Sequence, residues 1–227
     1  MSHVRRQRGF TLMEMSVVLV IIAVILGAVT VGRDVYRSAV AERIHSDFIQ
    51  GWLLAYDRYL AQSGTVPNDP TYSGLIGGST GAAPLCGDEL LNQMLARGVA
   101  LPAGAFEGRQ DTYVYQDRNG LTQRLQVCLM AVKDWAEPVS TTSYIPRSRN
   151  VMRISNLTPE LANQLDQRID GGVDARFGRV REVTRHNTTS VSLTADAGKW
   201  SRNEHPENAS HPEARVETVT AYVKLGQ

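Results

Sequence analysis

The sequence has few cysteines, no surplus of either charge and no motif of an established catalytic centre. Its 227 residues include 24 Lys and Arg against 23 Asp and Glu. The chain therefore lacks the basic surplus of nucleic-acid-binding proteins, and we expect no nucleic-acid partner. Two cysteines are too few for a metal site of the CxxC type. A GxSxG elbow, an HExxH helix and a phosphate loop are also absent, so we predict neither an enzyme nor a cofactor or metal ion.

The composition is nevertheless that of a folded protein. Hydrophobic residues make up 42% of the chain, which suffices for one sizeable core, or for a core with a small lobe. The two cysteines are Cys86 and Cys128. Because the N-terminus has the features of an exported chain, we predict one disulfide between them in an oxidising compartment. Two buried free thiols are the alternative.

The most informative feature is an apolar run near the start of the chain. Residues 15–32 contain no charged side chain, and the arginines Arg5, Arg6 and Arg8 precede them. A run of this length can span a bilayer. Basic residues on its N-terminal side place the short N-terminus in the cytoplasm and everything from Arg33 onward outside.

One acidic residue, Glu14, lies inside the front of the apolar segment. A carboxylate at this depth costs several kcal/mol unless a partner neutralises it, so we expect Glu14 to have a function. An ordinary cleavable signal peptide is the alternative interpretation of this region. The apolar run is longer than a usual signal-peptide core, however, and no A-x-A cleavage site follows it.

The stretch Arg8-Gly9-Phe10-Thr11-Leu12-Met13-Glu14 resembles the leader junction of type IV prepilins and type II secretion pseudopilins. The resemblance implies that a prepilin peptidase cuts after Gly9 and N-methylates Phe10, the new first residue. It also implies that Glu14 stays in the membrane segment. A carboxylate in the first helical turn is favourable, and it can pair with the Phe10 amine of a neighbouring subunit. Such a buried pair sets the register of assembly more than it stabilises.

The membrane segment contains two pairs of small residues, Ala23 with Gly27 and Ala28 with Gly32. Pairs of this spacing let helices approach one another closely, so we predict that these four residues contribute to helix packing. The alternative is that they reflect the general abundance of small residues in membrane helices.

Beyond Arg33 the pattern becomes amphipathic, and we expect the helix to continue to Ser63, with Gly64 as its C-cap. The predicted apolar stripe, interpreted as core, comprises Tyr36, Val40, Ile44, Phe48, Trp52, Ala55 and Tyr59. The resemblance implies an α+β, pilin-like fold in which this long N-terminal α-helix packs on an antiparallel β-sheet head. The expected organisation is a cleaved leader at 1–9, a transmembrane and assembly helix at 10–32, its amphipathic continuation at 33–63 and the head at 64–227.

Within the head, the sequence predicts several separate elements. They are a loop-dominated stretch over 66–108 with a short helix at 88–97, a hairpin of 112–115 with 125–129 turning at Asn119-Gly120, a helix from Thr158 to Ile169, and strands at 190–194 and 216–225. Alternation along the second hairpin strand puts Leu125, Val127, Leu129 and Ala131 on one face. Cys128 therefore points to the other face, where a loop carrying Cys86 is expected to cover the sheet.

Polar residues of the second half give no metal prediction. His205 and His211 lie in a polar run without a third ligand, and Asp170 and Asp174 lack the spacing of an EF-hand loop. We interpret both pairs as solvated loop residues.

The expected function is that of a structural subunit, minor or accessory, of a type IV pilus-like filament. Its expected partners are the prepilin peptidase, other pilin or pseudopilin subunits, an inner-membrane assembly platform and membrane lipid. The precursor is expected to cross the bacterial inner membrane once, with its head in the periplasm, before it enters a pilus or pseudopilus that can reach the cell surface. The alternatives are a minor pseudopilin of type II secretion and a non-polymerising anchored protein whose head binds a ligand or acts as an enzyme.

Overall fold

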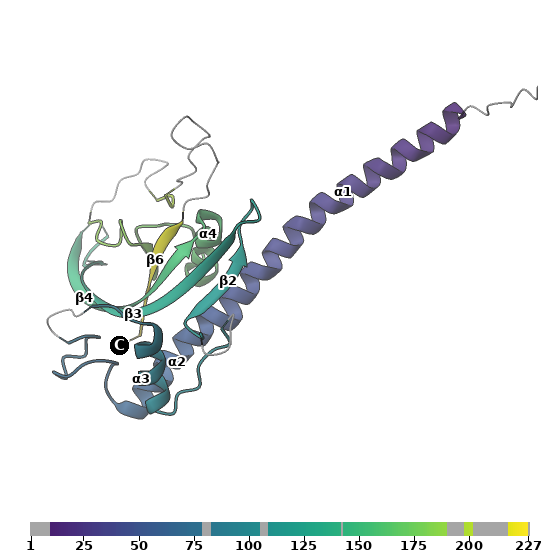
Figure 1. Cartoon of the computed structure of the whole chain (residues 1–227). Coiled ribbons are helices and arrows are strands. Elements are labelled where there is room, and N and C mark those ends of the chain that lie inside the picture. The colour runs from purple at the N-terminus through teal and green to yellow at the C-terminus, as the bar shows by residue number, and fades with distance from the viewer. Residues whose placement is uncertain are drawn as a thin grey trace, which may run out of the picture. The chain divides into compact units, whose positions relative to one another are not determined.

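A computed structural model of the chain describes residues 10–78, 83–104, 109–141, 143–189, 198–201 and 218–226 (Figure 1). A long N-terminal helix is followed by an open antiparallel sheet of six strands, which confirms the predicted α+β, pilin-like fold. The chain forms two compact units, which meet in sequence between Glu42 and Arg43.

The N-terminal helix runs from Leu12 to Ser63. It consists of α1 (Leu12–Arg43), a π-helical segment η1 (Ile44–Ile49) and α2 (Gln50–Ser63). Gly64 ends it with a φ of 69°, and its backbone N–H donates to Leu60 O at 2.9 Å. Glycine adopts this left-handed conformation without a steric penalty, so the predicted C-cap is confirmed.

The predicted apolar stripe is buried only in its second part. Ile44, Phe48 and Trp52 have no exposed surface, whereas Tyr36 is 65% exposed, so the prediction of a core position was wrong for Tyr36. Every side chain from 10 to 36 is exposed, so this part of the helix has no buried face on which Tyr36 could lie. The π-helical segment has an extra residue per hydrogen-bonded turn, and its Ile44, Phe48 and Ile49 are buried.

The sheet has the strand order β1-β3-β4-β6-β5, and β2 also pairs with β3. Its strands are β1 (Leu85–Cys86), β2 (Thr112–Gln116), β3 (Thr122–Pro138), β4 (Tyr144–Leu157), β5 (Val180–Glu182) and β6 (Val219–Lys224). These strands pair in antiparallel fashion. The strand predicted at 216–225 is confirmed by β6, whereas the one predicted at 190–194, like His205 and His211, lies outside the described residues.

One face of the sheet packs on η1 and α2. The rings of Phe48 and Tyr113 are 5.4 Å apart, and Trp52 Nε1 donates to Gln110 O at 3.0 Å. Buried Asn150 on β4 adds a polar contact, since its Nδ2 donates to Gly74 O at 2.8 Å while its Oδ1 accepts from Ile76 N at 2.9 Å. The apolar residues of β3 that were predicted to share a face are all buried: Leu125, Val127, Leu129 and Ala131.

The opposite face carries a smaller core. It contains Val132, Trp135, Val151 and Tyr222, with Met130 and Val183 packed against it. A register shift of β3 between Val132 and Trp135 marks a β-bulge, which lets both side chains face this core. The sequence did not predict β4 or this second core.

The hairpin of β2 and β3 forms as predicted, but its loop is wider than an Asn-Gly turn. Gln116 pairs with Thr122, so five residues connect the strands. Asp117 Oδ1 accepts from the backbone N–H groups of Asn119 and Leu121, each at 2.9 Å, and Gly120 has a φ of 80°. The aspartate therefore organises a longer loop around the glycine.

The disulfide forms between paired strands and not through a covering loop. Cys86 lies on β1 and is the register partner of Cys128 on β3, with their Cα atoms 4.5 Å apart. The predicted position of Cys86 in a loop above the sheet was therefore wrong, because Leu85 and Cys86 add a short strand beside β3.

Two further helices belong to the head. The helix predicted at 88–97 corresponds to α3 (Gly87–Ala96), and the one predicted from Thr158 corresponds to α4 (Pro159–Asp170). Thr158 Oγ1 accepts from Leu161 N at 3.3 Å, and Gly171 follows α4 with a φ of 78°. Both predicted helices are confirmed, and the caps of α4 are the predicted ones.

Candidate processing and assembly segment

The first turn of α1 is closed by two side chains, Thr11 and Glu14. Glu14 Oε2 accepts from Thr11 N at 2.8 Å and from Thr11 Oγ1 at 2.9 Å, and Thr11 Oγ1 accepts from Glu14 N at 3.2 Å. This reciprocal arrangement is a capping box, in which two backbone donors of the helix start are satisfied. It holds the Glu14 carboxylate at the beginning of the helix, where the helix dipole favours negative charge.

Phe10 precedes this capping box and is 81% exposed. The structure thus presents the residue after the predicted cleavage site outside the helix, next to the capped turn. Gly9 itself and the arginines before it lie outside the described residues. Cleavage after Gly9 and N-methylation of Phe10 stay predictions.

The following helix is long and apolar enough to cross a membrane. Its large apolar side chains between Leu12 and Val35 are exposed in the single chain. Ser16 Oγ donates to Met13 O and Thr30 Oγ1 donates to Gly27 O, each at 2.8 Å. These hydroxyls are therefore satisfied inside the helix, as an apolar environment requires.

The four small residues of this segment are all exposed: Ala23, Gly27, Ala28 and Gly32. A Cβ atom added at Gly27 or Gly32 would meet nothing within 4 Å, so no contact among the described residues explains either glycine. Close approach at these positions requires another molecule, and their role in helix packing stays a prediction.

In the head, Asp134 and His186 have the geometry of a catalytic dyad. His186 Nε2 is 2.9 Å from Asp134 Oδ1, and Nδ1 is 2.7 Å from Val183 O. Burial tends to raise the pKa of Asp134, but hydrogen bonds from His186 and Asn187 outweigh it and lower the pKa below its usual value. Because both ring nitrogens face acceptors, neither is left to activate a nucleophile, and the contact is structural.

Asp170, at the end of α4, binds the protein backbone. Asp170 Oδ2 accepts from the backbone N–H groups of Arg179 and Val180, at 2.8 and 2.9 Å. Among the residues that the structure describes, no group of three or more His, Cys, Asp or Glu side chains is arranged to hold a metal ion.

Sequence reasoning identified Glu14 but missed its partner Thr11. The signal was present, because Thr11-Leu12-Met13-Glu14 has the T-x-x-E spacing of a capping box before an apolar run. The buried polar groups of the head were also missed, since they depend on pairings between distant strands.

Comparison with known proteins bears on the N-terminal segment. Residues 4–30 match the model of the prokaryotic N-terminal methylation motif. No curated protein and no solved structure matches the chain. The chain therefore carries at its N-terminus the class III signal peptide of type IV pilins and pseudopilins.

Proposed function

We propose that the chain is a minor or accessory structural subunit of a type IV pilus-like filament. A prepilin peptidase cuts after Gly9 and methylates Phe10, and the mature chain is extracted from the inner membrane and polymerised through its N-terminal helix. The observation that carries the proposal is the capped Glu14 carboxylate at the start of an apolar, exposed helix. A simple membrane anchor gains only a helix cap from this carboxylate, which places a charge inside its apolar segment.

Each segment of the chain has its own expected role in this proposal. Residues 1–9 form the leader, 10–32 the transmembrane and assembly helix, 33–63 its amphipathic continuation and 64–227 the head. The small residues of the assembly helix provide the close contacts with neighbouring helices. Partners are the prepilin peptidase, other subunits of the filament, the assembly platform and lipid.

Two features favour a minor subunit. The chain is longer than the major pilins that its N-terminus resembles, and its disulfide joins Cys86 to Cys128 in mid-chain instead of closing a C-terminal loop. A minor pseudopilin of type II secretion is the second candidate, because the methylation motif is shared by pilins and pseudopilins.

Replacement of Glu14 by alanine tests the proposal. We expect Glu14→Ala to insert into the membrane normally but to enter sheared filaments roughly tenfold less, because the neighbour's amine loses its partner. Ser16→Ala is the matched control in the same segment and should behave like the wild type. Normal incorporation of Glu14→Ala would contradict the role of Glu14 in assembly, and absence of both the wild type and the variant from sheared filaments would favour a non-polymerising anchored protein.

Immunogold labelling separates the two candidates. Label along or at the tip of sheared surface filaments supports a pilus subunit. Label confined to the envelope, together with loss of protein secretion on deletion, supports a pseudopilin.

A further inference from the structure

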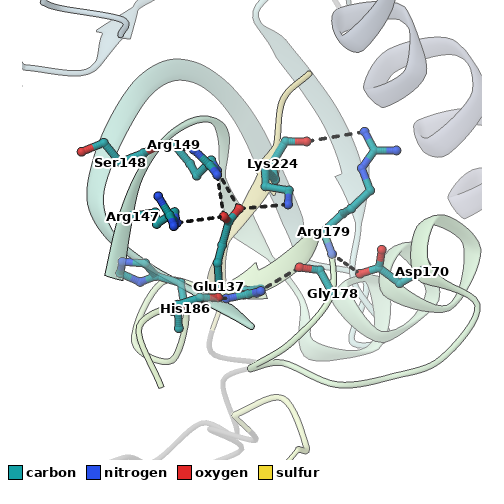
Figure 2. A network of polar contacts seen from close by, with 11 residues as sticks. Glu137, Arg147, Ser148, Arg149, Asp170, Gly178, Arg179, His186 and Lys224 are labelled. Atoms are coloured by element: carbon teal, nitrogen blue, oxygen red, sulfur yellow. Dashed lines mark hydrogen bonds and ion pairs between the residues drawn. The ribbon is translucent and has the colours of Figure 1, made fainter. Parts of the chain in front are cut away.

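Basic side chains gather where β3, β4 and β6 run side by side (Figure 2). Arg147 and Arg149 of β4 and Lys224 of β6 all approach the carboxylate of Glu137 on β3. Arg179 adjoins them, since its backbone O accepts from Lys224 N at 2.8 Å. These four cations and Glu137 are called the basic cluster below.

One of the cations, Arg149, binds both carboxylate oxygens of Glu137. Arg149 Nε donates to Oε1 at 2.6 Å and Arg149 Nη2 donates to Oε2 at 2.5 Å, a bidentate pair. The hydrogen bonds from Arg149 hold the pKa of Glu137 below its usual value. Lys224 Nζ lies 3.4 Å from Oε1 and Arg147 Nε lies 3.8 Å from Oε2, so both have only long contacts with this carboxylate.

Among the residues that the structure describes, three cations of the cluster therefore share the single carboxylate of Glu137. Glu137 is the carboxylate that contacts Arg147, Arg149 and Lys224, and Figure 2 shows Asp170 at the backbone of Arg179. Asp170 Oδ2 is engaged by backbone N–H groups. The side chain of Arg147 is 53% exposed and that of Lys224 is 32% exposed, so an incoming anion can reach both.

The surroundings favour a carboxylate on a protein over a nucleic acid. Binding of single strands uses exposed aromatic rings for base stacking, but near the cluster Trp135 and Tyr222 are buried, and the half-buried rings of Tyr144 and Phe177 pack on each other at 4.8 Å. The chain also lacks an overall basic surplus. Guanidinium groups match carboxylates in geometry, as Arg149 and Glu137 demonstrate.

We propose that the basic cluster docks an acidic surface on the head of a neighbouring filament subunit. This proposal rests on the proposed function, because it requires a filament in which heads meet. The docked carboxylates contact Arg147 and Lys224, while Glu137 and Arg149 keep the cluster in place.

Zero-length coupling with a carbodiimide tests the proposal on the full-length protein in sheared filaments. The reagent joins the Lys224 ammonium to a carboxylate in contact with it, and mass spectrometry identifies the linked peptide. We expect Lys224 linked to an Asp or Glu of another subunit. Arg147→Glu should lower the yield roughly tenfold through like-charge repulsion, while Arg124→Glu, an exposed arginine elsewhere on β3, should leave it unchanged.

Two results would overturn the proposal. One is coupling of Lys224 to Glu137 of the same chain alone, and the other is a yield that Arg147→Glu does not change. Absence of the protein from sheared filaments would instead contradict the proposed function. The same filament samples show this directly, so the two failures can be told apart.

Discussion

Glu14 Oε2 lies 2.8 Å from the backbone nitrogen of Thr11, and this contact closes the first turn of the long apolar helix. The carboxylate is therefore held by its own chain before any neighbour is present. Assembly through Glu14 requires that a neighbour's amine joins or replaces Thr11 as its partner.

Removal of the Thr11 hydroxyl should loosen this turn. In Thr11→Ala, amide exchange at residues 12–15 should be about fivefold faster, the effect expected for loss of a helix cap. Thr11→Ser keeps the hydroxyl and should exchange like the wild type. Exchange measured in detergent micelles checks this, and identical rates in Thr11→Ala would show that the capping box does not hold the turn.

Loss of the disulfide should destabilise the head. Cys86 and Cys128 are 42 residues apart in sequence, and closing a loop of that size contributes about 3–4 kcal/mol in the chain-entropy model. The double variant Cys86→Ser/Cys128→Ser should unfold at a lower urea concentration. An unchanged midpoint, with and without reductant, would contradict a structural disulfide.

Asp166 should make the stability of the folded protein vary with pH. Burial raises its pKa to about 7, although hydrogen bonds from Trp200 and Asp174 oppose the rise. Because the unfolded value is about 3.9, the folded state favours the protonated acid, and stability falls as pH rises from about 4 through 7. Asp166→Asn mimics the neutral acid. Its stability relative to the wild type should increase over that range in thermal unfolding, and a constant difference would contradict this.

Arg181 should be required for the second core. It donates to Ala136 O at 2.7 Å and to His186 O and Gly178 O at 3.0 Å, and its guanidinium lies 4.1 Å from the centre of the Trp135 ring. Lysine lacks this planar fork, so Arg181→Lys should lower the free energy of unfolding by about 2–4 kcal/mol. Arg124→Lys on the surface is the control. Urea unfolding followed by tryptophan fluorescence measures both, and equal midpoints for the two variants would show that the fork is dispensable.

Local signals in the sequence predicted much of the fold. Gly64 and Gly171 end helices, and Thr158 begins one. Each of these caps involves only residues nearby in the sequence, so a local pattern predicts it. The apolar N-terminal helix and Glu14 were likewise predicted, since a charge inside a long apolar run is recognisable without any knowledge of tertiary contacts.

Features that depend on distant pairings were not predicted. Pro146 and the polar run at 147–150 interrupt the apolar pattern of β4, and this hid a strand whose Arg147 and Arg149 contact a carboxylate on β3. The π-helical segment at Ile44–Ile49 also has no simple sequence signal.

The N-terminus of the mature protein tests the central claim most directly. Intact-mass and N-terminal analysis of the protein from membranes should show a chain that begins with N-methylated Phe10. A chain that begins at any other residue, or that keeps residues 1–9, would contradict processing as a pilin-like subunit.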